Sequence, residues 1–122
     1  MEISLDTGGS NLVRSYGPDR IVIGERTFRA AIVLSPEAIL EDRLPRRPEE
    51  LAPAHLEAVT ALGPEVVLVG TGARLRFPAP EVTAPLLARG IGVEVMDTGA
   101  ACRTYNVLAS EGRRVVALLL LG

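Results

Sequence analysis

The sequence predicts a single α/β domain, in which an N-terminal antiparallel β-meander leads into a C-terminal β-α-β-α-β unit with parallel strands. Near the N-terminus, short β-branched runs are separated by tight-turn residues, a pattern typical of antiparallel neighbours. In the second half, apolar strand-like runs alternate with helical patterns, which favours parallel strands joined by right-handed crossovers. A length of 122 residues fits one domain over residues 1–122.

The meander is expected to contain three strands. Residues 11–16 and 20–23 predict two strands joined by Gly17-Pro18-Asp19, a turn in which proline presets φ. Gly24-Glu25-Arg26 predicts a second turn, after which residues 27–34 are expected to form the third strand.

Two segments of the first half show no strong periodicity. Residues 1–9 are expected to be a loosely held start. Residues 35–53 contain four prolines among mixed charges and predict a solvated loop, with a short helical turn at residues 37–40 as an alternative. A loop that docks a partner is the alternative function for this segment.

The second half alternates strands and helices. We predict helices over residues 54–62, 80–89 and 99–111, and strands over residues 65–69, 92–96 and 114–121. Pro85 lies inside the second of these helices and predicts a kink or a late start. The strand runs 66–69 and 115–121 are apolar without alternation, as expected for strands that are covered on both faces.

Composition excludes several classes of function. Proteins that bind nucleic acids usually carry a strong excess of basic residues, whereas this chain has a net charge of −2. We therefore expect no nucleic-acid partner. One cysteine excludes an internal disulfide, and one histidine with that cysteine argues against a multi-ligand zinc site, so we expect neither metal nor cofactor. The longest apolar run, residues 115–121, is too short to span a bilayer, and residues 1–4 lack the pattern of a secretory signal. We therefore expect a cytoplasmic protein. All 13 basic residues are arginine, which indicates a GC-rich, bacterial coding bias.

The stretch from Ile91 to Leu108 concentrates polar groups at one strand-to-helix junction. Asp97 and Thr98 both suit the N-cap of the following helix, because a side-chain oxygen can accept from its first free amides. Cys102 falls within the first turns of this helix, near the positive end of its dipole.

Two glycine-containing loops are candidate site elements. Gly70-Thr71-Gly72 and Asp97-Thr98-Gly99 each follow a predicted strand, and parallel α/β sheets bind ligands at the carboxyl ends of their strands. If the two strands are neighbours, the loops face each other to form a pocket with Cys102, Arg103 and Asn106 above it. The alternative is that the glycines only serve tight turns and that Asp97 and Thr98 only cap a helix.

Three kinds of chemistry could use this junction: cysteine nucleophilicity, dinucleotide binding and anion binding. A helix N-terminus and Arg103 would both favour a Cys102 thiolate. A catalytic cysteine would also need a base, and the sole histidine, His55, lies on a different predicted helix. A lone cysteine among alanines is typical of a packing residue. The Gly70-x-Gly72 turn lacks the third glycine of a dinucleotide fingerprint. Asp97 would repel an anion at the helix start, where the helix dipole alone would attract one.

The order and spacing of these motifs resemble a known family. The strings V-V-L-V-G-T-G (66–72), G-I-G-V-E-V-M-D-T-G-A-A-C-R-T-Y-N (90–106) and E-G-R-R-V (111–115) are similar to the small α/β domain family, a domain of unknown function, that includes mitochondrial complex I assembly factor 3 and uncharacterised bacterial proteins. The family pattern recurs here at Gly70, Thr71, Gly72, Asp97, Thr98, Cys102, Thr104, Tyr105 and Asn106. Family members often carry a tryptophan after the third strand, where this chain has Glu41-Asp42-Arg43. The resemblance implies a binding or assembly factor with no established catalysis.

We therefore expect a non-catalytic binding or assembly module, whose partner is another protein, a second copy of the chain or a small molecule. Its expected binding residues are Gly70, Thr71, Gly72, Asp97, Thr98, Cys102, Arg103, Thr104 and Asn106. A cysteine-dependent enzyme or redox-sensitive protein using Cys102, and a binder of a small anionic metabolite, are the alternatives.

Overall fold

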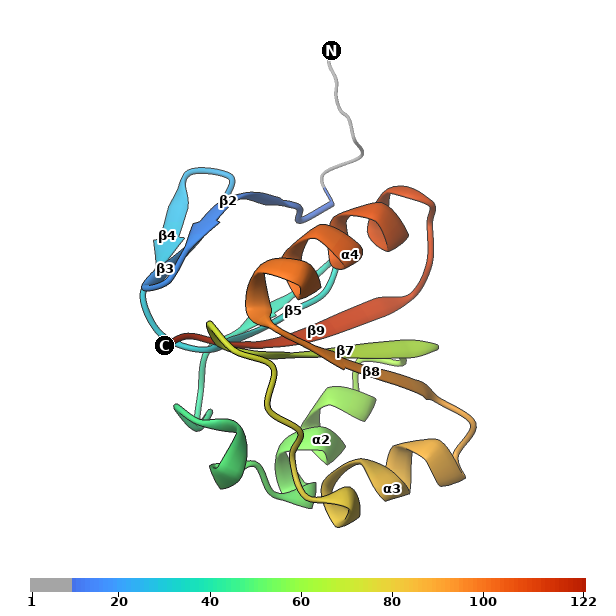
Figure 1. The fold of residues 1–122 in the computed structure, drawn as a ribbon. Helices are drawn as coiled ribbons and strands as arrows, with labels where there is room; N and C mark the ends of the chain where they lie inside the picture. Colours follow the sequence, from blue (N-terminus) through green and yellow to red (C-terminus); the bar gives the residue numbers. More distant parts are fainter. Residues whose placement is uncertain (1–9) are drawn as a thin grey trace.

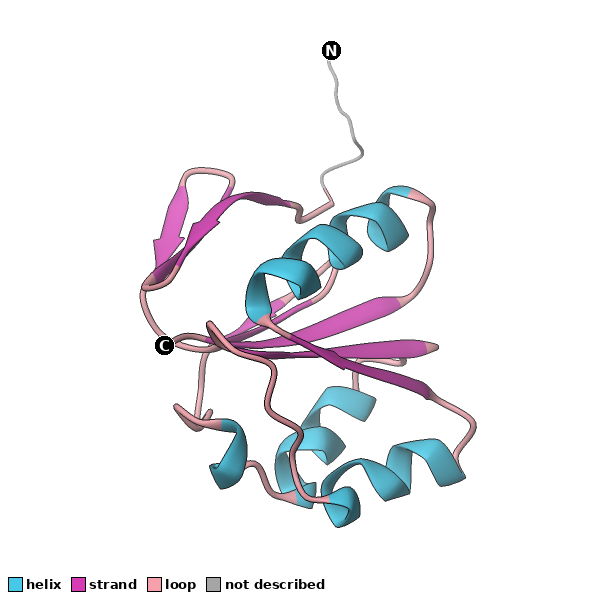
Figure 2. Cartoon of the chain, viewed as in Figure 1, coloured by secondary structure: helices cyan, strands magenta, loops and turns pink. Residues whose placement is uncertain are grey.

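The structure, a computed structural model, describes residues 10–122, so the expectation for residues 1–9 lies outside it. Two β-sheets and four helical segments make up the described chain (Figure 2). The three-stranded sheet contains β2 (Val13–Gly17), β3 (Arg20–Ile23) and β4 (Arg26–Phe28). The five-stranded sheet has the order β6 (Ile39–Leu40), β5 (Ile32–Leu34), β9 (Val115–Leu120), β7 (Val66–Thr71) and β8 (Gly92–Met96). The helices are η1 (Pro48–Glu50), α2 (Pro53–Thr60), α3 (Pro80–Ala88) and α4 (Thr98–Ser110).

The strand directions confirm the predicted fold class. β2, β3 and β4 form an antiparallel meander. β7 pairs in parallel with β8 on one side and with β9 on the other, which is the expected β-α-β-α-β unit. β5 joins the open side of β9 in antiparallel fashion, so the two halves of the chain share one sheet.

The five-stranded sheet is covered on both faces, as the unbroken apolar runs predict. α2 and α3 lie on one face, and α4 with the small sheet lies on the other (Figure 1). Along β7, Val67 and Val69 belong to the core on the α2–α3 side, whereas Val66 and Leu68 belong to the core under α4. This alternation of period two gives each face its own packed layer.

The prediction of one strand over residues 27–34 is wrong. β4 ends at Phe28 in the small sheet, and β5 begins at Ile32 in the large one. The chain crosses between the sheets at residues 29–31, where Arg29 and Ala30 are exposed. Phe28, Ile32 and Leu34 still share the core under α4, whereas Val33 belongs to the core on the α2–α3 side.

The segment after β5 forms a β-turn instead of the alternative helical turn at residues 37–40. The Ser35 hydroxyl accepts from the backbone N–H of Ala38 at 3.0 Å, and the Ser35 N–H donates to the Ala38 carbonyl at 2.8 Å. Ile39 and Leu40 can then pair with β5 as β6. The remainder of residues 35–53 is largely loop around η1.

The helices of the second half lie where the sequence predicts. α3 accommodates Pro85 without interruption and is followed by Gly90 at φ 78°. Among residues 10–122, no helix combines the length and the hydrophobicity needed to cross a bilayer.

Candidate functional site

The two glycine-containing loops meet, as predicted from parallel neighbouring strands. Gly70 of β7 lies opposite Met96 of β8, so both loops leave the same edge of the sheet. The Thr98 N–H donates to the Gly72 carbonyl at 2.9 Å, and the Gly72 N–H donates to Thr98 Oγ1 at 2.7 Å. The two loops are therefore joined directly by a pair of hydrogen bonds.

Thr98 extends this connection to a third strand. Its hydroxyl donates to the Leu120 carbonyl at 2.5 Å, and the residue is only 6% exposed. One side chain at the start of α4 thus ties together the carboxyl ends of β7 and β9 beside that of β8. Because a buried polar group costs free energy unless it is paired, this arrangement makes Thr98 a structural residue.

Gly70 permits the close packing of α4 on β7. A Cβ atom at this position would lie 2.9 Å from Thr98 Oγ1, 3.0 Å from Thr98 Cα and 3.2 Å from the Cβ of Ala101. Only glycine fits between the strand and the helix without displacing one of them.

Thr71 shapes the loop that follows β7. Its hydroxyl donates to the Arg74 carbonyl at 2.5 Å and accepts from the Arg76 N–H at 3.1 Å. Gly72 next to it has a φ of 96°, a conformation that favours glycine. Both residues therefore have local structural roles.

Asp97 is the N-cap of α4, as predicted. Its side chain accepts from the Ala100 N–H at 2.8 Å, which satisfies one of the free amides of the first turn. Thr98, the second predicted cap, is instead the first residue of the helix.

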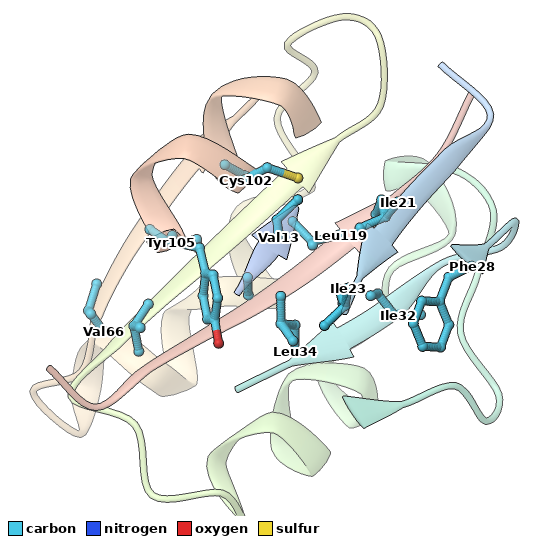
Figure 3. Close-up of a cluster of buried hydrophobic side chains, with 14 residues drawn as sticks. Val13, Ile21, Ile23, Phe28, Ile32, Leu34, Val66, Cys102, Tyr105 and Leu119 are labelled. Atoms are coloured by element: carbon cyan, nitrogen blue, oxygen red, sulfur yellow. The ribbon is translucent and has the colours of Figure 1, made fainter. Parts of the chain in front are cut away.

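Cys102 packs in the core beneath α4. It is 1% exposed and lies in the buried cluster with Val13 and Leu119 (Figure 3). Burial raises the pKa of the thiol to about 12, against a weaker opposing effect of the Arg103 charge. His55 lies on α2, across the sheet from α4, where its Nδ1 accepts from the Ala52 N–H at 2.9 Å. The environment favours the thiol over the thiolate and places no imidazole beside it.

The end of the T-Y-N motif fastens the first strand to α4. Asn106 Oδ1 accepts from the Val13 N–H at 2.8 Å, and Asn106 Nδ2 donates to the Val13 carbonyl at 2.8 Å. The Tyr105 hydroxyl donates to the Asn11 carbonyl at 2.7 Å, and burial raises the pKa of Tyr105. Thr104 is half-buried on the same helix.

A pocket of about 400 Å³ remains at the surface beside the start of α4. We refer to it as the Tyr16–Arg103 pocket; Gly17, Pro18, Gly72, Ala73, Asp97, Thr98, Gly99, Leu120, Leu121 and Gly122 complete its lining. Arg103 Nη1 donates to the Tyr16 hydroxyl, and the guanidinium carbon lies 5.9 Å from the centre of the Tyr16 ring. Besides apolar groups, the lining includes the Asp97 and Arg103 side chains.

The chain matches one protein family over residues 13–120, and this family is described as "Protein of unknown function (DUF498/DUF598)". The chain belongs to this family. This match confirms the resemblance inferred from the motifs. The relatives of this chain include proteins named as assembly factors.

Relatives within this family carry different names. A Danio rerio protein named "NADH dehydrogenase [ubiquinone] 1 alpha subcomplex assembly factor 3" is 34% identical over 94% of this chain and 67% of its own length. The Mus musculus protein of the same name is 33% identical over 81% of this chain and 54% of its own length. A Francisella tularensis protein named "13 kDa major membrane protein" is 28% identical over 88% of both chains.

Solved structures of related proteins share the fold. A Bordetella parapertussis protein has a TM-score of 0.88 at 43% identity, covering 96% of this chain and all (100%) of its own. A Xanthomonas campestris protein has a TM-score of 0.84 at 42% identity, covering 93% of this chain and 86% of its own. A Bartonella henselae protein described as an outer membrane protein has a TM-score of 0.76 at 31% identity, covering 93% of this chain and 96% of its own.

In this member of the family, the structure brings only some of the predicted site residues to one surface. Gly72, Asp97, Thr98 and Arg103 line the Tyr16–Arg103 pocket, whereas Gly70, Thr71, Cys102, Thr104 and Asn106 do not. The sequence does not indicate that Tyr16 and the predicted turn after it belong to this pocket, because the contact between Tyr16 and Arg103 joins positions 87 residues apart. The available signal in the sequence is a tyrosine placed directly before the turn residues Gly17-Pro18.

Proposed function

We propose that this chain is a non-catalytic module that binds another protein during assembly of a larger complex, and that the Tyr16–Arg103 pocket is its contact site. Membership in a family with relatives named assembly factors supports the class of function. The partner that these names suggest is a subunit of an NADH dehydrogenase, or another protein needed for its assembly.

One observation carries the choice of site. Within the motif 97–106, Thr98, Cys102, Tyr105 and Asn106 direct their functional groups into the fold, whereas Arg103 is exposed and reaches Tyr16 across the pocket. Tyrosine and arginine are the residue types that most often dominate binding energy at protein interfaces. The guanidinium has donors beyond the one that it gives to Tyr16, so it can accept a carboxylate or a carbonyl of the partner.

The burial of Cys102 argues against the alternative of a cysteine-dependent enzyme or redox-sensitive protein. A thiol with its pKa raised to about 12 is protonated at neutral pH and is a poor nucleophile. Binding of a small anion at Arg103 remains the competing proposal for this pocket, because a guanidinium beside a helix start suits an anion.

Affinity capture tests the protein-binding proposal. The full chain is immobilised and exposed to an extract of the source cells, and captured proteins are quantified for wild type, Arg103→Ala and Arg14→Ala. Arg14 is an exposed arginine on β2 outside the pocket, which makes it the matched control. We expect a stoichiometric partner that Arg103→Ala loses and Arg14→Ala retains. Equal recovery with all three proteins would refute the site.

The proposal includes the cellular location of the chain. We propose the cytoplasm, in agreement with the lack of a spanning helix among residues 10–122. Two relatives carry names that refer to membranes. Fractionation of source cells, with a wash of the membranes at high salt, separates a cytoplasmic protein from one that is held at a membrane.

A further inference from the structure

β8 forms one border of the large sheet, and within residues 10–122 it pairs only with β7. The Gly92 N–H donates to the Glu65 carbonyl at 3.1 Å, toward the β7 side. Because backbone groups alternate in direction along a strand, the N–H and C=O groups of Val93 and Val95 point away from β7. An extended segment laid along β8 would find these groups ready to pair.

The helix that precedes β8, α3, carries an exposed leucine. Arg89 reaches toward α2, where it pairs with Glu57 at 3.7 Å and donates to Thr60 at 3.3 Å. Leu87 is two residues earlier, about 200° away around the helix, and is 56% exposed. Leu87 therefore lies on the side of α3 that faces away from α2.

Glu94 lies on β8 between Val93 and Val95. It is exposed, and no guanidinium among residues 10–122 forms an ion pair with it. Val93 and Val95 pack toward the α2–α3 core, so Glu94 projects from the opposite face of the strand. The edge thus has an unpaired carboxylate above it and apolar side chains below it.

This charge decides between two kinds of occupant. Two copies of the chain that pair β8 with β8 over its full length are related by a two-fold axis, which places Glu94 opposite its own equivalent. Like charges directly opposite each other destabilise a strand pair. A segment with a cation at that position gains an ion pair instead.

We propose that the open edge of β8 binds an extended segment of a partner protein by strand addition, with a lysine or arginine opposite Glu94 and apolar residues on both sides of it. The apolar residues would contact Val93, Val95 and Leu87, while the backbone pairs with Val93 and Val95. This edge lies outside the Tyr16–Arg103 pocket, so the inference goes beyond the proposed function and does not depend on it.

The probe is a short capped peptide of alternating threonine and valine with one central arginine, titrated into nitrogen-labelled protein and followed by NMR. Two control peptides are used, one with a central glutamate and one with N-methyl groups on the amides that would pair with β8. We expect the Val93 and Val95 amide signals to shift and their hydrogen exchange to slow. The arginine peptide should bind about fivefold more tightly than the glutamate peptide, and the methylated one should not bind.

A charge reversal makes the test reciprocal. Glu94→Lys should bind the glutamate peptide more tightly than the arginine peptide, whereas Glu111→Lys, at the far end of α4, should keep the wild-type preference. Both side chains are exposed, so neither change should disturb the fold.

Four results would overturn the proposal. The first is equal binding of the three peptides, and the second is the absence of a shift at Val93 and Val95. The third is a shift confined to Gly99 and Arg103, which would support the Tyr16–Arg103 pocket instead. The fourth is slow exchange of both valine amides together with a doubled mass in the absence of peptide, which would show that a second copy occupies the edge.

Discussion

The side-chain amide of Asn106 pairs with the main chain of Val13 as a neighbouring strand would. It donates to the Val13 carbonyl and accepts from the Val13 N–H, each at 2.8 Å. Helix α4 thereby takes the place of a strand beside β2, because β2 pairs on its other side with β3. A residue that the sequence marks as a binding candidate fixes the small sheet to the domain.

Replacing Asn106 by alanine should lower the free energy of unfolding by about 1–3 kcal/mol. The change removes two hydrogen bonds and leaves both backbone groups of Val13 without their partner. Chemical denaturation measures the loss, and hydrogen exchange at Val13 should accelerate more than exchange in β7. Ser110→Ala, at the exposed end of α4, is the control and should have little effect. An Asn106→Ala protein as stable as wild type would contradict this role.

Thr98→Val should be destabilising by about 2 kcal/mol. Valine keeps the shape of the side chain but leaves the Gly72 N–H and the Leu120 carbonyl without the Thr98 hydroxyl. Thr98→Ser retains the hydroxyl and should cost less than about 1 kcal/mol. The comparison by thermal or chemical unfolding isolates the hydroxyl; equal losses for both variants would show that only packing matters here.

Gly70→Ala should cost about 1–3 kcal/mol, as overpacking of a close contact does. The added Cβ would approach Thr98 Cα at 3.0 Å, and this neighbour is backbone that cannot rotate away. Unfolding measurements test the size of the loss, and NMR should show shifts concentrated at the start of α4. A neutral result would mean that α4 can move off β7 without penalty.

Cys102 should react with an alkylating reagent only as fast as the protein opens. Its burial and a pKa raised to about 12 leave almost no accessible thiolate in the folded state at neutral pH. The labelling rate should rise with denaturant in step with unfolding. Rapid labelling of the native protein at pH about 7, well below the reference thiol pKa of about 8.5, would instead restore the cysteine-dependent alternative.

The Cys102 thiol should also make the free energy of unfolding fall as the pH rises into the alkaline range. In the unfolded chain the thiol ionises near pH about 8.5, whereas in the folded chain it stays protonated until about 12. Between these values the unfolded state binds fewer protons, so the free energy of unfolding falls as the pH rises. Denaturation at pH about 7.5 and about 9.5 should show a decrease that is smaller, by about 1 kcal/mol, in Cys102→Ala. Equal decreases in the two proteins would contradict this assignment.

The local sequence pattern predicts much of this fold, because the sequence signals of most helices and strands agree with the elements that the structure shows. The uninterrupted apolar runs of β7 and β9 correctly indicate strands covered on both faces, and Asp97 correctly indicates the start of α4. The break between β4 and β5 is missed because residues 27–34 contain neither glycine nor proline. What separates the two strands is the sheet to which each belongs, and this is a tertiary property.

The sequence predicts that the two glycine-containing loops meet, but it does not predict what their side chains contact. Parallel strand order correctly brings Gly70-Thr71-Gly72 and Asp97-Thr98 together. A sequence does not show whether a hydroxyl points to a ligand or to a carbonyl, and Thr98 donates to Leu120. The Tyr16–Arg103 contact depends on how the small sheet folds over α4, which no local pattern contains.

The most direct test of the central claim uses Gly99, whose added Cβ would lie 2.9 Å from a side-chain atom of Tyr16. Because Tyr16 is exposed and can move, and because alanine favours a helix over glycine, Gly99→Ala should keep the stability of wild type or exceed it. It should also displace Tyr16 from Arg103 and partly fill the pocket. We predict that Gly99→Ala, with an unchanged or raised melting temperature, loses the protein that wild type captures from the cell extract. Capture at the wild-type level by this folded variant would contradict the claim that the Tyr16–Arg103 pocket binds the partner.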